Sequence, residues 1–129
     1  MTKRRVVLTG AAGYLADRML PVLRERYDLV LLDLRTRNQE GREVEGIVVA
    51  DLLSRDRDTY REHFRGADAV IHCAFIRWDR SDVDSYFSSE MVNVTMAYNV
   101  LRSAFEAGVE RVAMASSNHA ADWYEHMLI

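Results

Sequence analysis

Two glycines near the N-terminus have the spacing of a phosphate-binding turn. Gly10 and Gly13 lie between a short apolar run and a segment with helical periodicity. The first glycine permits a tight turn, and the second lets the backbone approach a pyrophosphate group. The free N–H groups and the positive dipole end of the following helix would then face the phosphates. Glycines at this spacing also occur in ordinary strand-to-helix turns, so other residues must decide between the two interpretations.

An acidic residue follows at the distance at which such sites bind a ribose. Asp33 ends the second apolar run, twenty residues after Gly13. A carboxylate there accepts hydrogen bonds from both ribose hydroxyls of an adenosine and repels a 2′-phosphate. Arg35 and Arg37 are nearby and could instead favour a phosphorylated cofactor. Because Asp33 occupies the strand end itself, the sequence favours a dinucleotide without a 2′-phosphate.

Polar residues also follow the later apolar runs. Asp51 follows the third run, His72 and Cys73 end the fourth, and Ser116 and Ser117 follow the fifth. No glycine-flanked elbow surrounds either serine, so a hydroxyl that orients a substrate oxygen fits better than a hydrolase nucleophile. One His–Cys pair without a partner at ligand spacing does not support a metal site. Capping of turns is the simpler interpretation of Asp51 and of the serines.

The composition excludes several classes of protein. The chain has 129 residues, 17 basic and 20 acidic, and a formal net charge of −3, and all basic residues but Lys3 are arginines. No cluster of positive charge predicts a nucleic-acid partner. Cys73 is the only cysteine, which indicates a reducing compartment and a cytoplasmic protein. No apolar run is long enough to predict a membrane span.

The elements that must position these residues alternate along the chain. Short apolar runs predict strands at residues 6–8, 29–32, 47–50, 69–72 and 112–115. Helical spacing predicts a helix over residues 15–27, which Pro21 should kink or begin irregularly, and a short helix around Tyr60 and Phe64 that Gly66 ends. A long helix is predicted over residues 85–107. This order predicts an α/β fold with a parallel sheet and right-handed crossovers.

The long helix has two apolar faces. Large side chains recur in steps of four and three, namely Phe87, Met91, Val94, Tyr98, Leu101 and Phe105. Smaller side chains form a second face, namely Val92, Ala97, Val100 and Ala104. A helix that is apolar on two faces lies between layers or in a subunit contact. We therefore expect the smaller face to be partly bare and the chain to be a homo-oligomer, through this helix or through the edge of the fifth strand.

Taken together, these motifs resemble the extended short-chain dehydrogenase/reductase family, the NAD-dependent epimerase/dehydratase group. The resemblance rests on residues 9–16, Asp33, residues 51–52, 68–75, Asn93, 99–101, 108–111 and 115–117, which occur in the family's order and spacing. It implies a Rossmann-like doubly wound parallel sheet of five strands, truncated before the C-terminal substrate part. It also implies NAD as the cofactor.

The same resemblance implies a role for each matched residue. The pyrophosphate would be bound by Gly10, Gly13, Tyr14 and Leu15. The adenosine ribose would be held by Asp33 and Leu34, and the adenine would be flanked by Asp51 and Leu52. The nicotinamide ribose would lie against Cys73, Ala74 and Phe75, with Asn93 beneath it, and Ser116 would also belong to the cofactor site.

Residues 116–119 are similar to the corresponding run of the uronate dehydrogenases within this family. The similarity implies that Ser117 is the catalytic hydroxyl and that Asn118 and His119 lie near a sugar acid. Arg77 would suit a carboxylate or a phosphate of the substrate.

The family's acid–base pair is a Tyr and a Lys four residues later, and it cannot be present, because Lys3 is the only lysine. Residues 1–129 are therefore expected to be an incomplete NAD-binding domain, inactive alone, of an oxidoreductase acting on a sugar or sugar acid. A nucleotide-sugar epimerase/dehydratase and a non-catalytic dinucleotide sensor remain alternatives.

Overall fold

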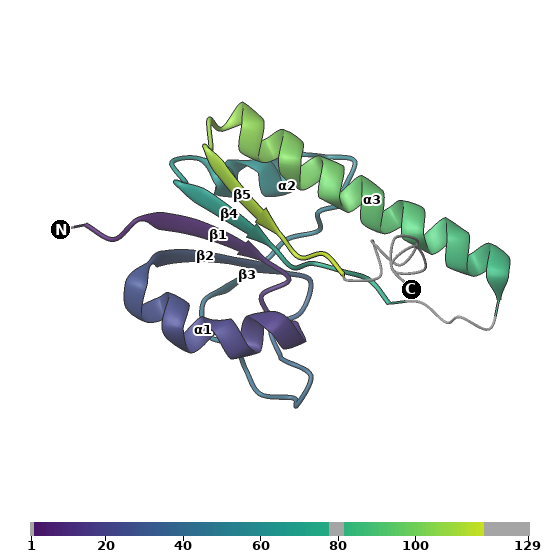
Figure 1. The fold of residues 1–129 in the computed structure, drawn as a ribbon, viewed down its shortest axis with the longest axis horizontal. Helices are drawn as coiled ribbons and strands as arrows, with labels where there is room; N and C mark the ends of the chain where they lie inside the picture. The colour runs from purple at the N-terminus through teal and green to yellow at the C-terminus, as the bar shows by residue number, and fades with distance from the viewer. Residues whose placement is uncertain (1, 78–81, 118–129) are drawn as a thin grey trace, which may run out of the picture.

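A five-stranded sheet forms the centre of the computed structural model, which describes residues 2–77 and 82–117 (Figure 1). Its strands are β1 (Arg5–Thr9), β2 (Asp28–Asp33), β3 (Ile47–Val49), β4 (Ala69–His72) and β5 (Arg111–Met114). All neighbouring strands are parallel, in the order β3-β2-β1-β4-β5. The predicted α/β class and Rossmann-like parallel sheet are confirmed. Because the strand order reverses at β1, a crevice is expected at the carboxyl ends of β1 and β4.

Helices cover both faces of the sheet (Figure 1). One face packs against α1 (Tyr14–Arg26), and the other against α2 (Asp58–Arg61), the short η1 (Glu62–Phe64) and α3 (Val83–Glu106). Val7 and Leu8 are neighbours in β1, belong to opposite faces and are both fully buried. Two covered faces explain why the central strands are continuous apolar runs instead of alternating ones.

The helix around Pro21 differs from the prediction. α1 begins at Tyr14 and continues through Pro21, so the proline does not mark the start of the helix. Pro21 lies on the exposed side of α1. The missing N–H there removes one intrahelical hydrogen bond, and solvent can satisfy the carbonyl that this leaves free.

The face of α3 that packs on the sheet is the one with small side chains, which was expected to be partly bare. Val100 and Ala104 of the smaller face are fully buried on the sheet, together with Met96. The bare face is the one with large side chains, whose members are all exposed, namely Phe87, Met91, Val94, Tyr98, Leu101 and Phe105. Small side chains let a helix approach a sheet closely, which explains why the smaller face is the one that packs.

Within the described residues, no helix is both long and apolar enough to cross a membrane.

Candidate functional site

The turn after β1 packs against the chain that follows β4. Gly10 has a φ of +71°, a backbone conformation that favours glycine. A Cβ at this position would lie 2.6 Å from the backbone nitrogen of Ala74 and 2.7 Å from the carbonyl carbon of Cys73. Glycine is thus required at residue 10 for two independent reasons. The close approach brings together two segments that the sequence predicted to share a site.

The first turn of α1 is open towards the carboxyl ends of the strands. Gly13 precedes the helix in an extended conformation, and its N–H donates to the carbonyl of Gly10 at 2.9 Å. No side chain caps this turn within the part of the chain that the structure describes. Its N–H groups are therefore available to an anion. The side chains of Tyr14 and Leu15 are exposed beside them.

Arg18 adds a positive charge to this end of α1. Its guanidinium lies over the ring of Tyr14, 3.6 Å from the ring centroid. Sequence analysis missed Arg18, although a cation one turn after the glycines could have been noted as a signal. A guanidinium near the start of α1 strengthens the positive potential at this end.

Asp33 is fixed by the backbone at the end of β2. One carboxylate oxygen accepts a hydrogen bond from the N–H of Ala12 at 2.9 Å, and the other accepts one from the N–H of Arg35 at 2.9 Å. Because Ala12 belongs to the glycine turn, the carboxylate ties that turn to β2. The two features predicted to bind a pyrophosphate and a ribose are therefore next to each other.

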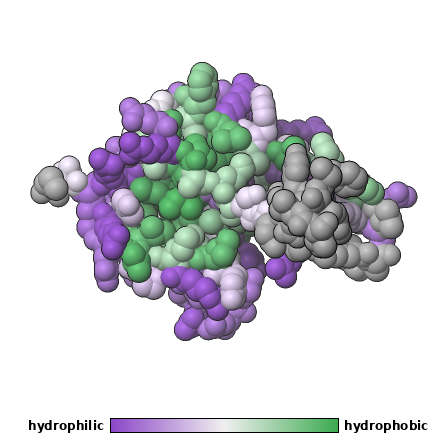
Figure 2. All heavy atoms as spheres, viewed as in Figure 1, coloured by the Kyte–Doolittle hydropathy of each residue, from purple (hydrophilic) through white to green (hydrophobic). Residues whose placement is uncertain are grey.

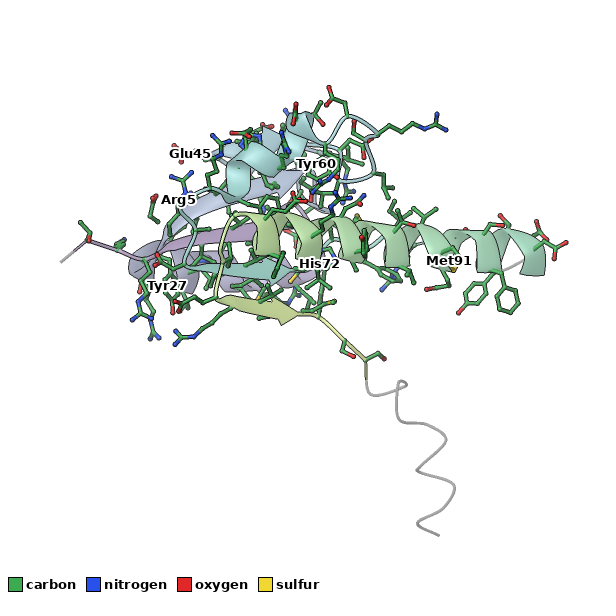
Figure 3. The ribbon with its side chains drawn as sticks, turned by 90° about the horizontal axis from the view of Figure 1, so that it is seen from above. Arg5, Tyr27, Glu45, Tyr60, His72 and Met91 are labelled. Atoms are coloured by element: carbon green, nitrogen blue, oxygen red, sulfur yellow. The ribbon has the colours of Figure 1, made fainter. Side chains whose placement is uncertain are left out.

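A buried polar pair joins β1 to β4 beneath this turn. Thr9 Oγ1 and His72 Nδ1 are 2.6 Å apart, and both residues are buried. Burial lowers the pKa of His72, so its imidazole is neutral at neutral pH. His72, labelled in Figure 3, is two residues from the buried Val70 in β4 and therefore shares the face of the sheet that packs against α3. The pair joins the carboxyl ends of β1 and β4 next to the glycine turn, and sequence analysis gave Thr9 no such role.

The segment after β4 is held in place by α3. Asn93 accepts a hydrogen bond from the N–H of Ile76 at 2.8 Å and donates one to its carbonyl at 2.9 Å. Cys73 and Ala74 are half-buried here, and burial raises the pKa of the Cys73 thiol. Phe75 and Arg77 are exposed. The amide of Asn93 is thus engaged by the backbone of this segment, and its expected place beneath a nicotinamide ribose stays a prediction.

In the turn after β3 the side chains of Asp51 and Leu52 have opposite exposure, the first in solvent and the second in the core. The carboxylate of Asp51 is exposed and accepts a hydrogen bond from the N–H of Leu53 at 2.9 Å, which is the turn-capping role. The side chain of Leu52 is buried in the core under α3, and its carbonyl accepts a hydrogen bond from Asn99 at 2.8 Å. Leu52 can therefore offer a ligand its backbone but little of its side chain.

The segment after β5 reaches the same edge of the sheet. Ala115 donates its N–H to the carbonyl of His72 at 3.0 Å, and Ser116 and Ser117 follow as exposed residues. Asn118 and His119 lie outside the described residues. No group of three metal-ligating side chains occurs in residues 2–77 and 82–117.

The fold and this arrangement define a class of protein: an α/β domain in which a glycine turn, an open helix start and the carboxylate that ends β2 lie together at one edge of a parallel sheet. The chain belongs to the NAD dependent epimerase/dehydratase family, whose sequence profile matches residues 6–127. It is 32% identical over 120 residues to the L-arabinose 1-dehydrogenase (NAD(P)+) of Haloferax volcanii. That match covers 93% of this chain and 43% of the relative.

Solved structures agree with this assignment. Uronate dehydrogenase from Agrobacterium tumefaciens superposes with a TM-score of 0.68 and 29% identity, over 92% of this chain and 42% of that one. MoeE5 in complex with UDP-glucose and NAD superposes with a TM-score of 0.70 and 26% identity, over 88% and 36% of the two chains. The chain thus spans about two fifths of the length of the relatives it matches.

Proposed function

We propose that residues 1–129 form the NAD-binding portion of an oxidoreductase that acts on a sugar or sugar acid. The observation that supports the proposal is the hydrogen bond from the N–H of Ala12 to Asp33, which sets a carboxylate suited to ribose beside a turn suited to a pyrophosphate. Family membership and neighbours that contain NAD or are named as sugar and sugar-acid dehydrogenases support it.

Each end of the cofactor has a matching part of the proposed site. The pyrophosphate would bind the glycine turn and the first turn of α1, where N–H groups are free and Arg18 adds a charge. The adenosine ribose would bind Asp33, with Leu34 beside it and the turn at Asp51 near the adenine. The nicotinamide end would lie along residues 73–75, which Asn93 holds through Ile76. Held along residues 73–75, the nicotinamide would supply a hydride acceptor for the carbon that bears the reacting hydroxyl.

Asp33 provides the test of the cofactor. Its carboxylate should favour NAD over NADP, because a 2′-phosphate would be repelled. Asp33→Asn should weaken NAD binding by about 10–100-fold, the range for loss of a hydrogen bond to a charged group, and should narrow the preference over NADP. Calorimetric titration with both cofactors measures this. Asp51→Asn is the matched control, since it neutralises an exposed carboxylate at the neighbouring strand end and should leave the preference unchanged.

The affinity of the wild-type chain for the two cofactors can also contradict the proposal. Tighter binding of NADP than of NAD would contradict the assignment and would give the exposed Arg35 the decisive role. Absence of binding by a folded chain would contradict the proposed site itself.

Ser117 is the proposed catalytic hydroxyl. It follows β5 at the edge of the sheet that also holds the glycine turn, and it would orient the reacting hydroxyl while a base removes the proton. Arg77, Asn118 and His119 are the proposed contacts to the sugar acid. Ser117→Ala should weaken binding of galacturonate or glucuronate to the NAD-loaded chain by roughly 3–10-fold, the value of one neutral hydrogen bond, without changing NAD affinity. A larger effect of Ser116→Ala would move the role to that residue.

A nucleotide-sugar epimerase or dehydratase is the second candidate. The neighbour that contains both UDP-glucose and NAD is the observation that favours it. Titration of the NAD-loaded chain with UDP-glucose beside the two hexuronates separates the candidates, because each predicts tighter binding of its own substrate class.

A further inference from the structure

α3 holds the backbone of two segments that follow different strands. After β4, the side chain of Asn93 accepts a hydrogen bond from the N–H of Ile76 at 2.8 Å and donates one to its carbonyl at 2.9 Å. After β3, the side-chain amide of Asn99 donates a hydrogen bond to the carbonyl of Leu52 at 2.8 Å. The two asparagines are separated by about 9 Å along the helix axis. One helix therefore fixes a segment at each of the two ends of the proposed cofactor site.

The turn after β3 depends on Asn99 for its connection to α3. Within the turn, the carboxylate of Asp51 accepts a hydrogen bond from the N–H of Leu53 at 2.9 Å, and the carbonyl of Asp51 accepts one from the N–H of Ser54 at 3.1 Å. These local bonds set the shape of the turn but not its position. Among the described residues, the bond from Asn99 is the only hydrogen bond that joins residues 51–54 to a helix or strand.

Packing supports the same contact. The side chain of Leu52 is buried in the core cluster that includes Val100, the residue after Asn99 in α3. Asn99 itself is half-buried, so its bond to the carbonyl of Leu52 is partly shielded from water. A hydrogen bond in such a place is electrostatically stronger than one in water, and a carbonyl that loses its donor there is costly. Residue 52 is thus fixed by its side chain and by its backbone.

We propose that Asn99 is a positioning residue for the adenine end of the cofactor, acting through the carbonyl of Leu52 on the turn at residues 51–54. This inference rests on the proposed function, which puts the adenine beside that turn. Asn93 contacts only the segment at the nicotinamide end. Because the two side chains hold different segments, loss of Asn99 affects the adenine end alone.

The first test compares NAD with ADP, which contains the adenine half of NAD and lacks the nicotinamide and its ribose. Asn99→Ala should weaken binding of both ligands to residues 1–129 by the same factor, roughly 3–10-fold, the value of one neutral hydrogen bond. Asn93→Ala is the matched control: it also removes an amide of α3 that bonds a backbone carbonyl, and it should weaken NAD but not ADP. Calorimetric titration measures all affinities.

Association of the chain does not interfere with this comparison. Figure 2 shows apolar side chains in the centre of the view, over β4 and β5, where Val112 and Met114 are exposed. Neither asparagine variant changes that surface, so the variants and the wild-type chain are compared in the same state of association.

The second test separates positioning from a general loss of stability. Nicotinamide hypoxanthine dinucleotide differs from NAD in the base, where an oxygen replaces the 6-amino group. The exposed carboxylate of Asp51 accepts from an amino group and not from a carbonyl, so the wild-type chain should prefer NAD. Asn99→Ala should narrow this preference. Glu106→Gln is the control: it weakens the bond of α3 to Arg57 at 2.8 Å, so it should lower stability in urea and keep the preference.

Different results would contradict the inference and the proposed function. Undiminished binding of ADP by Asn99→Ala, beside NAD binding by the wild-type chain, would overturn the role of Asn99 and leave the cofactor site standing. A wild-type chain that binds both dinucleotides equally, or equal narrowing by Glu106→Gln, would overturn it too. A folded wild-type chain that binds neither NAD nor ADP would contradict the proposed function itself. Asn99→Asp keeps the size of the side chain without the donor, and it replaces Asn99→Ala if circular dichroism finds that variant unfolded.

Discussion

The carboxylate of Asp33 is held by the backbone and keeps acceptor capacity for a ligand. Its oxygens accept hydrogen bonds from Ala12 and Arg35 while lone pairs remain for a ligand. A carboxylate that the backbone already holds loses little conformational freedom on binding, so the ribose hydroxyls of the proposed cofactor would meet an organised acceptor. The sequence predicted the location of Asp33 from its distance to the glycines. Its bond to Ala12 could not be predicted, because that bond depends on how the turn after β1 closes.

His72 illustrates the same limit at the level of one side chain. The sequence showed a histidine at a strand end and excluded a metal there. Its pairing with Thr9 depends on the register between β1 and β4, in which Thr9 lies directly opposite His72. Sequence patterns predict that two strands are parallel, but they do not predict which residues face each other across a non-consecutive pair.

Burial of His72 predicts a pH-dependent stability. Its folded pKa lies below the ordinary value of 6.5, so the unfolded chain binds a proton at a higher pH than the folded one. Stability should be unaffected by this group above pH 6.5 and should fall as the pH decreases below it, by at most about 1.4 kcal/mol per pH unit. Urea unfolding at pH 7.5 and 5.5 measures the difference.

Two variants assign this pH effect. His72→Gln keeps a partner for Thr9 without a titrating ring, so it should reduce the loss of stability between the two pH values. His63→Gln changes a half-exposed histidine in η1 and should leave the loss as in the wild type. If both variants lost the same stability between pH 7.5 and 5.5, His72 would not be the source of the pH dependence.

At the scale of elements, the strands were the most predictable part. Each predicted run overlaps an observed strand. Burial on both faces makes a central strand such as β1 continuous in apolar residues, whereas the edge strand β5 is equally apolar but exposed along its length, so full burial of every strand was wrongly expected. The use of α3 was not predictable in the same way. Its periodicity identified two apolar faces, but the choice between them depends on how close the helix must lie to the sheet. The smaller residues Val100 and Ala104 satisfy that distance.

The turn after β1 gives a prediction at this scale. Gly10→Ala should lower the free energy of unfolding by roughly 2–5 kcal/mol, because it combines a left-handed backbone with a clash against Ala74. It should also abolish NAD binding. Gly41→Ala is the matched control: Gly41 has a φ of +79° but open space around its Cβ position, so only about 1–2 kcal/mol should be lost and NAD binding kept. Chemical denaturation and calorimetry distinguish the two.

A milder outcome for Gly10 would contradict the geometry of the turn. If Gly10→Ala and Gly41→Ala cost the same, the close approach between the turn and residues 73–74 does not exist in solution.

At the scale of the whole molecule, the sequence predicted the class of fold, the family and the cofactor from motifs that lie far apart in the chain. The physical reason is that parallel strands bring their carboxyl ends to one edge, so residues after β1, β2 and β4 meet there. The identity of the substrate cannot be predicted by the same argument. Proposed substrate contacts such as Arg77 follow the strand ends, and strand periodicity does not determine the side-chain positions of loop residues.

The whole chain should bind NAD without turning it over. Residues 1–129 contain one lysine, Lys3, so the family's Tyr–Lys pair is absent from them, and general acid–base help is worth about 10²–10⁴ in rate. Incubation with NAD and galacturonate, glucuronate or UDP-glucose should produce no increase in NADH absorbance. Steady reduction of NAD by this chain would show that the missing pair is dispensable.

The most direct test of the account is a map of where NAD binds. Titration of ¹⁵N-labelled residues 1–129 with NAD should shift the amide signals of three separate segments: residues 10–15, Asp33 with Leu34, and residues 73–75. Signals at the far ends of the strands, such as Lys3 and Gly108, should stay unchanged. Shifts confined to any other surface, or an unchanged spectrum at millimolar NAD, would contradict the claim that this crevice is a dinucleotide site.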